Sequence, residues 1–204
     1  MSRVGIVNTG LCNLDSIARA VEECGSSPVV TDDPQDLVTA THIVLPGVGA
    51  FPAAMARLNE CGLVDALTEQ VVEGGIPFLG ICLGMQLLGT RGSEISATSG
   101  LGWIDGDVEL IIPGPGERVP HIGWNDVEPV EDAPLFRGIP AERDFYFVHS
   151  YVLRATREED IAARTPYGGG FVSAVQRGQI FGVQFHPEKS QRAGFDVLQN
   201  FLSI

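Results

Sequence analysis

The stretch FLGICLGMQLLG at residues 78–89 places a cysteine between two glycines, where an apolar run meets a helix-compatible segment. Cys82, with Gly80 and Gly84 around it, has the G-x-nucleophile-x-G layout of a nucleophile elbow. At such a sharp strand-to-helix turn the nucleophile is strained, and its neighbours approach other backbone too closely for a Cβ. Unpaired N–H groups at a helix start also favour a thiolate. The pattern predicts a reactive Cys82; the alternative is a buried cysteine at a glycine-rich strand end.

A thiolate nucleophile needs a base, and His186 and Glu188 in QFHPEKS (184–190) could supply a base and its orienting partner. Pro187 disfavours helix and biases His186 toward extended geometry. Residues i and i+2 of an extended segment face the same side, so the carboxylate could reach the imidazole and fix its tautomer. The alternative is a solvated loop glutamate beside a hydrogen-bonded histidine. His42, at a strand start, is expected to be structural.

Acyl transfer also requires hydrogen-bond donors for an oxyanion. The N–H of Leu83, directly after the nucleophile, is one candidate. A second is the glycine-rich loop 46–49, which contains Gly47 and Val48 and follows the apolar run at 42–45, at the edge where open α/β sheets bind ligands. The alternative for this loop is a plain strand-to-helix turn.

The composition excludes several classes of protein. At 204 residues with 44% hydrophobic content, we expect one globular domain over residues 1–204. The net charge of -13 would repel a phosphate backbone, which argues against nucleic acid as a partner. No apolar run approaches the roughly 20 residues of a membrane span, and the N-terminus does not resemble a signal peptide, so we expect a cytoplasmic protein.

The four cysteines show no metal-ligand spacing, because no C-x-x-C pair and no nearby histidine accompanies them. No metal site is therefore expected. A disulfide framework is not expected in a core-rich chain that we expect to be intracellular. Cys24 and Cys61 are expected to be small buried apolar residues, and Cys12 lies in a loop with no assigned role.

The order of the elements predicts an α/β fold: an open, mostly parallel central sheet flanked by helices, with additional antiparallel strands in the second half. Strand-like runs at 4–7, 28–30, 42–45 and 76–81 alternate with helical patterns from residue 14 and over 55–71. The second half predicts strands within 107–112, 145–153, 171–176 and 179–185, the last two joined as a hairpin. A closing helix is expected, capped by Ser190.

Five segments together resemble the class I (triad) glutamine amidotransferases. They are LPGVGAF (45–51), GICLGMQ (80–86), PHIGWN (120–125), FVHSY (147–151) and GVQFHPEKS (182–190). The match runs nearly from end to end. Within the family, the chain is most similar to the branch that supplies ammonia to a separate (β/α)8-barrel cyclase, which makes imidazole glycerol phosphate and aminoimidazole carboxamide ribotide in histidine biosynthesis.

The resemblance implies a heterodimer with that cyclase, L-glutamine as substrate, and no cofactor. It implies that Cys82 attacks the glutamine carboxamide, that His186 protonates the departing ammonia, and that Glu188 orients His186. Leu83 and the Gly47–Val48 peptide would stabilise the oxyanion. The implied glutamine-binding residues are Gly49, Gln86, Ser150 and Tyr151, and the implied interface residues are Asn13, Trp124 and Lys189.

One segment departs from the family pattern. Residues 8–14, NTGLCNL, stand where the family usually has an Asp-Tyr-Gly-x-Gly-Asn-Leu run, so Asn8, Thr9 and Cys12 differ in a loop that lies toward the cyclase. Three alternatives stay open: a glutaminase subunit for another acceptor synthase, a cysteine hydrolase on the same kind of sheet, and an inactive partner-binding regulatory subunit of the same fold.

Overall fold

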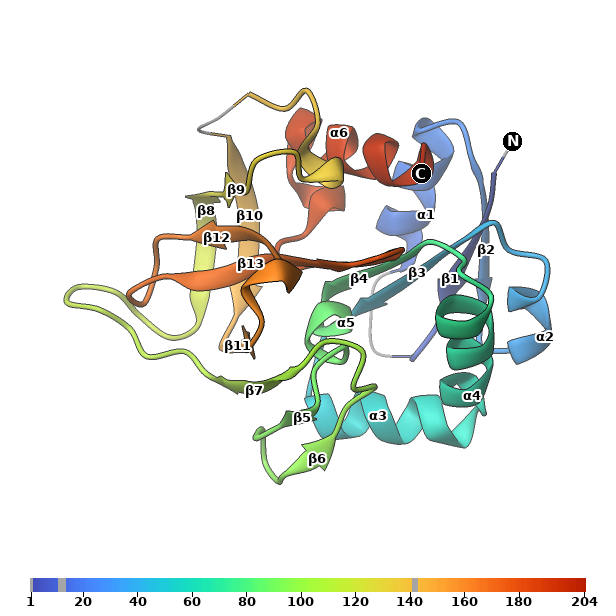
Figure 1. Ribbon diagram of the computed structural model, residues 1–204, viewed down its shortest axis with the longest axis horizontal. Coiled ribbons are helices and arrows are strands. Elements are labelled where there is room, and N and C mark those ends of the chain that lie inside the picture. The colour runs from blue at the N-terminus through green and yellow to red at the C-terminus, as the bar shows by residue number, and fades with distance from the viewer. Residues whose placement is uncertain (1, 11–13, 141–142) are drawn as a thin grey trace.

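The centre of the computed structural model, which describes residues 2–10, 14–140 and 143–204, is an eight-stranded sheet in the order β2-β1-β3-β4-β14-β13-β12-β9 (Figure 1). The strands from β2 to β14 in this order run parallel and the remainder run antiparallel. Their bounds are β1 Arg3–Val7, β2 Ser27–Thr31, β3 His42–Gly47, β4 Phe78–Cys82, β9 Glu128–Pro129, β12 Ile161–Thr165, β13 Phe171–Arg177 and β14 Ile180–Val183. The predicted fold class is confirmed.

Helices cover both faces of this sheet (Figure 1). One face packs against α1 and α6, and the other against α3 and α4. The side chains of β3 alternate accordingly: Val44 belongs to the first core, whereas Ile43 and Leu45 belong to the second. The helices are α1 Leu14–Glu23, α2 Pro34–Leu37, α3 Phe51–Glu60, α4 Leu63–Leu67, a π-helical turn Thr68–Glu73, α5 Leu83–Gln86 and α6 Gln191–Leu202.

The second half of the chain adds antiparallel strands, as predicted. A four-stranded sheet has the order β11-β7-β5-β6, and β8 pairs with β10 alone. The run at 145–153 is divided at Ser150 between two sheets. The predicted hairpin forms between β13 and β14, with Gly178 in the left-handed region at φ 58°. The bounds are β5 Arg91–Gly92, β6 Thr98–Ser99, β7 Gly106–Leu110, β8 His121–Asp126, β10 Asp144–His149 and β11 Tyr151–Ala155.

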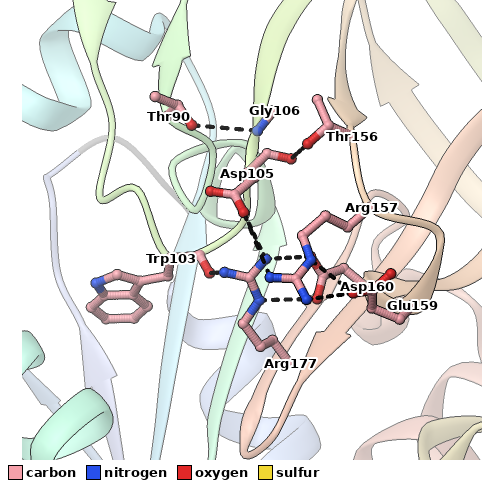
Figure 2. Close-up of polar contacts among 9 residues, drawn as sticks. All are labelled: Thr90, Trp103, Asp105, Gly106, Thr156, Arg157, Glu159, Asp160 and Arg177. Atoms are coloured by element: carbon pink, nitrogen blue, oxygen red, sulfur yellow. Dashed lines mark hydrogen bonds and ion pairs between the residues drawn. The ribbon is translucent and has the colours of Figure 1, made fainter.

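A partly buried ion pair holds this hairpin in place. Figure 2 shows Arg177, the last residue of β13, directed at Asp160 and Asp105 and at the carbonyl of Trp103. The Arg177 Nε donates to Asp160 Oδ1 at 2.9 Å, and the Asp160 side chain is only 3% exposed. Because a buried carboxylate without its cation is costly, the pair fixes the start of β14 and with it the segment that leads to His186.

Ser190 does not cap α6 as predicted. It occupies the N-cap position, but its side chain makes no capping hydrogen bond. The hydroxyl instead donates to the His186 carbonyl at 2.6 Å and accepts from the N–H of Tyr146 at 3.0 Å. Ser190 therefore ties the 186–190 turn to β10, a contact that local sequence rules do not reveal.

Three segments meet at one edge of the central sheet. Gly47 at the end of β3 is paired with Cys82 at the end of β4, and Val183 at the end of β14 is paired with Ile81. The carboxyl ends of parallel strands thus bring the glycine-rich loop, the elbow and the QFHPEKS segment together, at the edge where ligands bind in such sheets. Among the described residues, the helices fall short of the apolar length that a membrane crossing requires.

Candidate active site

Cys82 lies at a strained strand-to-helix turn. It ends β4 and is the N-cap of the single turn α5, with φ 55° and ψ -108°, a conformation that non-glycine residues rarely adopt. A Cβ at Gly84 would lie 1.8 Å from the Leu45 carbonyl oxygen, and one at Gly80 would lie 2.5 Å from the Gly84 carbonyl oxygen. The glycines are therefore required by close backbone approach, as the elbow pattern predicts.

We expect Gly84→Ala to destabilise the protein by about 3 kcal/mol, because the new methyl group meets backbone atoms that must move. Gly102→Ala is the matched control: nothing lies within 4 Å of its Cβ position, and its φ of +69° costs only the left-handed strain of about 1–2 kcal/mol. Urea denaturation of both variants measures the difference. A Gly84→Ala variant as stable as the unsubstituted protein would show that the elbow is not tightly packed.

His186 and Glu188 form a buried pair close to Cys82. The imidazole Nδ1 lies 2.8 Å from Glu188 Oε1, and the two side chains are 4% and 6% exposed. The carboxylate reaches the ring through a 3-10 turn at Pro187–Lys189, not through the extended segment that the sequence suggests. His186 itself is extended, at φ -100° and ψ 97°. Since an ionised carboxylate only accepts, Nδ1 carries the proton and Nε2 is left as the basic nitrogen.

The electrostatics of His186 favour its protonated form. Burial acts to lower the pKa of this imidazole, but the nearby Cys82 sulfur and the hydrogen-bonded Glu188 carboxylate outweigh burial and raise it to about 9. Nε2 is buried and has no hydrogen-bond partner among the described residues. The Cys82 sulfur interacts with His186, whose Nε2 has no other partner among the described residues. This arrangement suits proton transfer between the thiol and the imidazole.

A cavity of about 260 Å³ opens directly onto Cys82. The sequence-predicted residues that line it are Val48, Gly49, Cys82, Leu83, Gln86, Ser150 and Tyr151. Gly47 does not line the cavity but is paired with Cys82 between β3 and β4. Glu94, Val148 and His149 complete the lining and were not predicted. A larger hollow of about 660 Å³ lies beside Trp124 and Arg192, but no cysteine or histidine lines it.

The two backbone segments predicted to supply oxyanion donors both line the cavity beside Cys82. The first N–H groups of α5, beginning with Leu83, have no intrahelical acceptor. The loop after β3 reaches the same cavity through Val48 and Gly49, and Gly49 adopts φ +97°, which a residue with a side chain would rarely adopt. The two candidate donor segments therefore reach the same cavity as the nucleophile.

A chain of neutral histidines supports the wall of the cavity. The Tyr151 carbonyl accepts from His149 Nδ1 at 3.0 Å, so His149 Nε2 must accept from His121 Nδ1, also at 3.0 Å. His121 Nε2 is left to accept from Asn125 Nδ2 at 3.2 Å. Burial lowers the pKa of His121 to about 4 and that of His149 to about 3. Both rings are uncharged at neutral pH and connect β8 to the cavity.

The predicted interface residues lie away from the cavity floor. Trp124 on β8 is 47% exposed and packs edge-to-face against Tyr146, with ring centroids 5.9 Å apart. Lys189 holds its ammonium 6.0 Å from the centre of the Tyr146 ring, a cation–π arrangement. Asn13 lies outside the described residues.

Comparison with known proteins identifies the family. The profile described as glutamine amidotransferase class-I matches residues 6–204, and the chain belongs to this family. It is 47% identical to "Imidazole glycerol phosphate synthase subunit HisH" of Moorella thermoacetica over 98% of this chain and 94% of the relative. It is 42% identical to "Imidazole glycerol phosphate synthase subunit HisH 1" of Campylobacter jejuni strain RM1221 over 98% of this chain and all of that relative.

Solved structures support the fold. A structure described as a glutamine amidotransferase superimposes with a TM-score of 0.78 at 20% identity, covering 98% of this chain and 97% of the other. PurLQS from Thermotoga maritima gives a TM-score of 0.73 at 20% identity, covering all of this chain and 99% of the other. At this identity the likeness concerns the architecture of the chain.

Proposed function

We propose that this protein is the glutaminase subunit of an imidazole glycerol phosphate synthase and acts as a single domain over residues 1–204. The observation that carries the proposal is the meeting of Cys82, on its strained elbow, with the buried His186–Glu188 pair. The two named relatives, both described as subunits of imidazole glycerol phosphate synthase, support the proposal because each matches almost the whole chain. Ammonia released from L-glutamine would pass to a cyclase and serve histidine biosynthesis.

The reaction divides into two acyl transfers. The Cys82 sulfur, having given its proton to His186 Nε2, attacks the side-chain carbonyl carbon of glutamine. The tetrahedral intermediate collapses, the C–N bond breaks, and His186 returns the proton to the departing ammonia, which leaves a glutamyl thioester. Water then gives a proton to His186 and attacks the thioester, the C–S bond breaks, and glutamate leaves. Glu188 keeps the His186 tautomer correct and stabilises the imidazolium.

The backbone donors would stabilise the oxyanion of both intermediates. The N–H of Leu83 and the Gly47–Val48 peptide are the groups proposed for this role, and each such donor contributes about 10²–10³ in rate in comparable sites. Donors of this kind stabilise the developing charge when they are fixed in position before the reaction, because they then need no reorganisation. No charged side chain is needed for this part of the chemistry.

The polar groups of the cavity fit the amino-acid end of glutamine. Gln86 Nε2 donates to the Tyr151 carbonyl at 2.9 Å and to Gln184 Oε1 at 3.0 Å, so its own Oε1 remains free to accept. The Glu94 carboxylate lines the same cavity. Two acceptors suit the α-ammonium of the substrate, and we assign Gly49, Ser150 and Tyr151 to its remaining contacts.

We propose that the partner is a (β/α)8-barrel cyclase, which docks on the outer face of β8. Ile122 and Trp124 alternate along this strand and are 59% and 47% exposed. Tyr146 on the paired strand and Lys189 beside it continue the same surface. Exposed aromatic side chains gathered in one place are typical of a protein interface.

Reconstitution tests this function. With glutamine as the only nitrogen source, this protein and a (β/α)8-barrel cyclase should together make imidazole glycerol phosphate. A pair that works only when an ammonium salt is added would contradict the proposal. In the same assay, this protein carrying Trp124→Ala should be needed at about tenfold or more higher concentration for half-maximal synthesis with a fixed amount of cyclase, as loss of an interface anchor does. Val38→Ala, an exposed residue at the end of α2, should have no effect.

A further inference from the structure

Gln184 is a fully buried amide that contacts the reactive sulfur. It follows β14, two residues before His186, and is 0% exposed. Its Nε2 lies 3.6 Å from the Cys82 Sγ, and its Oε1 lies 3.0 Å from Gln86 Nε2. Neither the elbow nor the triad accounts for this residue, and a buried amide needs a partner for each end.

The direction of these hydrogen bonds is fixed by a backbone carbonyl. The Tyr151 oxygen can only accept, so the Gln86 side chain must direct its Nε2 toward it, at 2.9 Å. The same nitrogen reaches Gln184, whose Oε1 must therefore face Gln86. Gln184 is left with its Nε2 facing the sulfur. Reversing either amide would bring two oxygens or two N–H groups together.

The amide matters most when the sulfur is ionised. The neutral thiol can donate to the Val148 carbonyl, with 3.8 Å between Sγ and the oxygen. A thiolate loses this hydrogen bond and then faces a carbonyl dipole of the wrong sign. The N–H of Gln184, in contrast, points at the sulfur in both states and becomes a charge-assisted donor when the proton leaves.

We propose that Gln184 stabilises the Cys82 thiolate through an N–H···S hydrogen bond, oriented by a relay from the Tyr151 carbonyl through Gln86. This inference rests on the proposed role of Cys82 as nucleophile. It adds to the site a hydrogen-bond donor, the Gln184 amide, whose charge does not change with pH. Other titratable groups surround the sulfur and act in addition. They are His186, Glu188, His149, Glu94 and Tyr151.

The pH profile of Cys82 alkylation by iodoacetamide, read by mass spectrometry on the full chain, tests the proposal. Gln184→Met keeps the side-chain length and removes the donor. We expect the pH of half-maximal alkylation to rise by about one unit, the effect of one hydrogen bond to a charged group. The rate at pH 7 should fall only about threefold, because a less stable thiolate is a better nucleophile. Gln86→Met, which leaves Gln184 unoriented, should give a smaller shift in the same direction.

The exposed Gln199 supplies the control, and Gln199→Met should reproduce the original profile. A Gln184→Met profile that superimposes on the original would overturn the proposal, because a residue needed only for packing is replaced well by methionine. If that variant does not fold, as judged by circular dichroism, an unchanged Gln86→Met profile would overturn it instead. Failure of the proposed function looks different: Cys82 of the unsubstituted protein would then be alkylated no faster than the half-buried Cys61.

Discussion

Cys82→Ala should abolish glutamine-dependent synthesis, with a loss of at least about 10⁴-fold in kcat, because no other group can form the thioester. Synthesis driven by added ammonium salt should continue in the complex, since the cyclase does not need the thiol. Measuring both nitrogen sources in the same preparation separates loss of chemistry from loss of assembly.

Cys61→Ala is the matched control for this experiment. Cys61 is half-buried after α3, where it packs at the edge of the second core. Its substitution should leave both activities in place. Glutamine-dependent activity that survives Cys82→Ala would rule out the covalent mechanism, and equal loss of both activities would point to misfolding.

Glu188→Gln should lower kcat by about 10²–10⁴-fold, as removal of the orienting carboxylate does in comparable triads. The amide can donate to His186 Nδ1, which would shift the proton to Nε2 and leave no base for the thiol. The carboxylate also helps to raise the pKa of His186 to about 9. Without it that pKa falls, so the alkaline limb of kcat/KM, where imidazolium is lost, should move to lower pH.

Steady-state kinetics of glutamate release across pH measure both effects. Glu131→Gln changes an exposed glutamate beyond β9 and should alter neither kcat nor the pH profile. A Glu188→Gln variant with the original kcat would show that the tautomer of His186 is held in another way.

The sequence predicts those parts of the site that depend on local chain geometry. Neighbouring backbone lies so close to the turn around Cys82 that Gly84 has no room for a Cβ. This requirement can be recognised in the sequence from the spacing of the glycines. The parallel strands, the helices that cross between them and the β13–β14 hairpin follow from hydrophobic periodicity and turn residues. His42, expected to be structural, is buried against the Phe201 ring.

Contacts between distant segments could not be predicted in this way. Gln184 and Gln86 are 98 residues apart in the sequence. Nothing local distinguishes Gln184 from another glutamine near a strand, because its role depends on its contacts with Gln86 and Cys82 in the folded chain. Glu94 lies on a short loop between small strands and reaches the cavity only because that loop folds over α3, where it accepts from the Phe51 N–H at 2.7 Å. The sequence predicts that Ser190 caps a helix, because local rules do not reveal its competing contact with β10.

The measurement closest to the central claim is the identification of the residue that carries the glutamyl group. A glutamine-analogue electrophile, added to the complex with its cyclase and followed by peptide mass spectrometry, should modify Cys82 once per chain, and excess glutamine should protect it. We predict that the label stays on Cys82 in the unsubstituted protein and is absent from Cys82→Ala. A label found on another residue, or no label in the presence of the partner, would contradict the account.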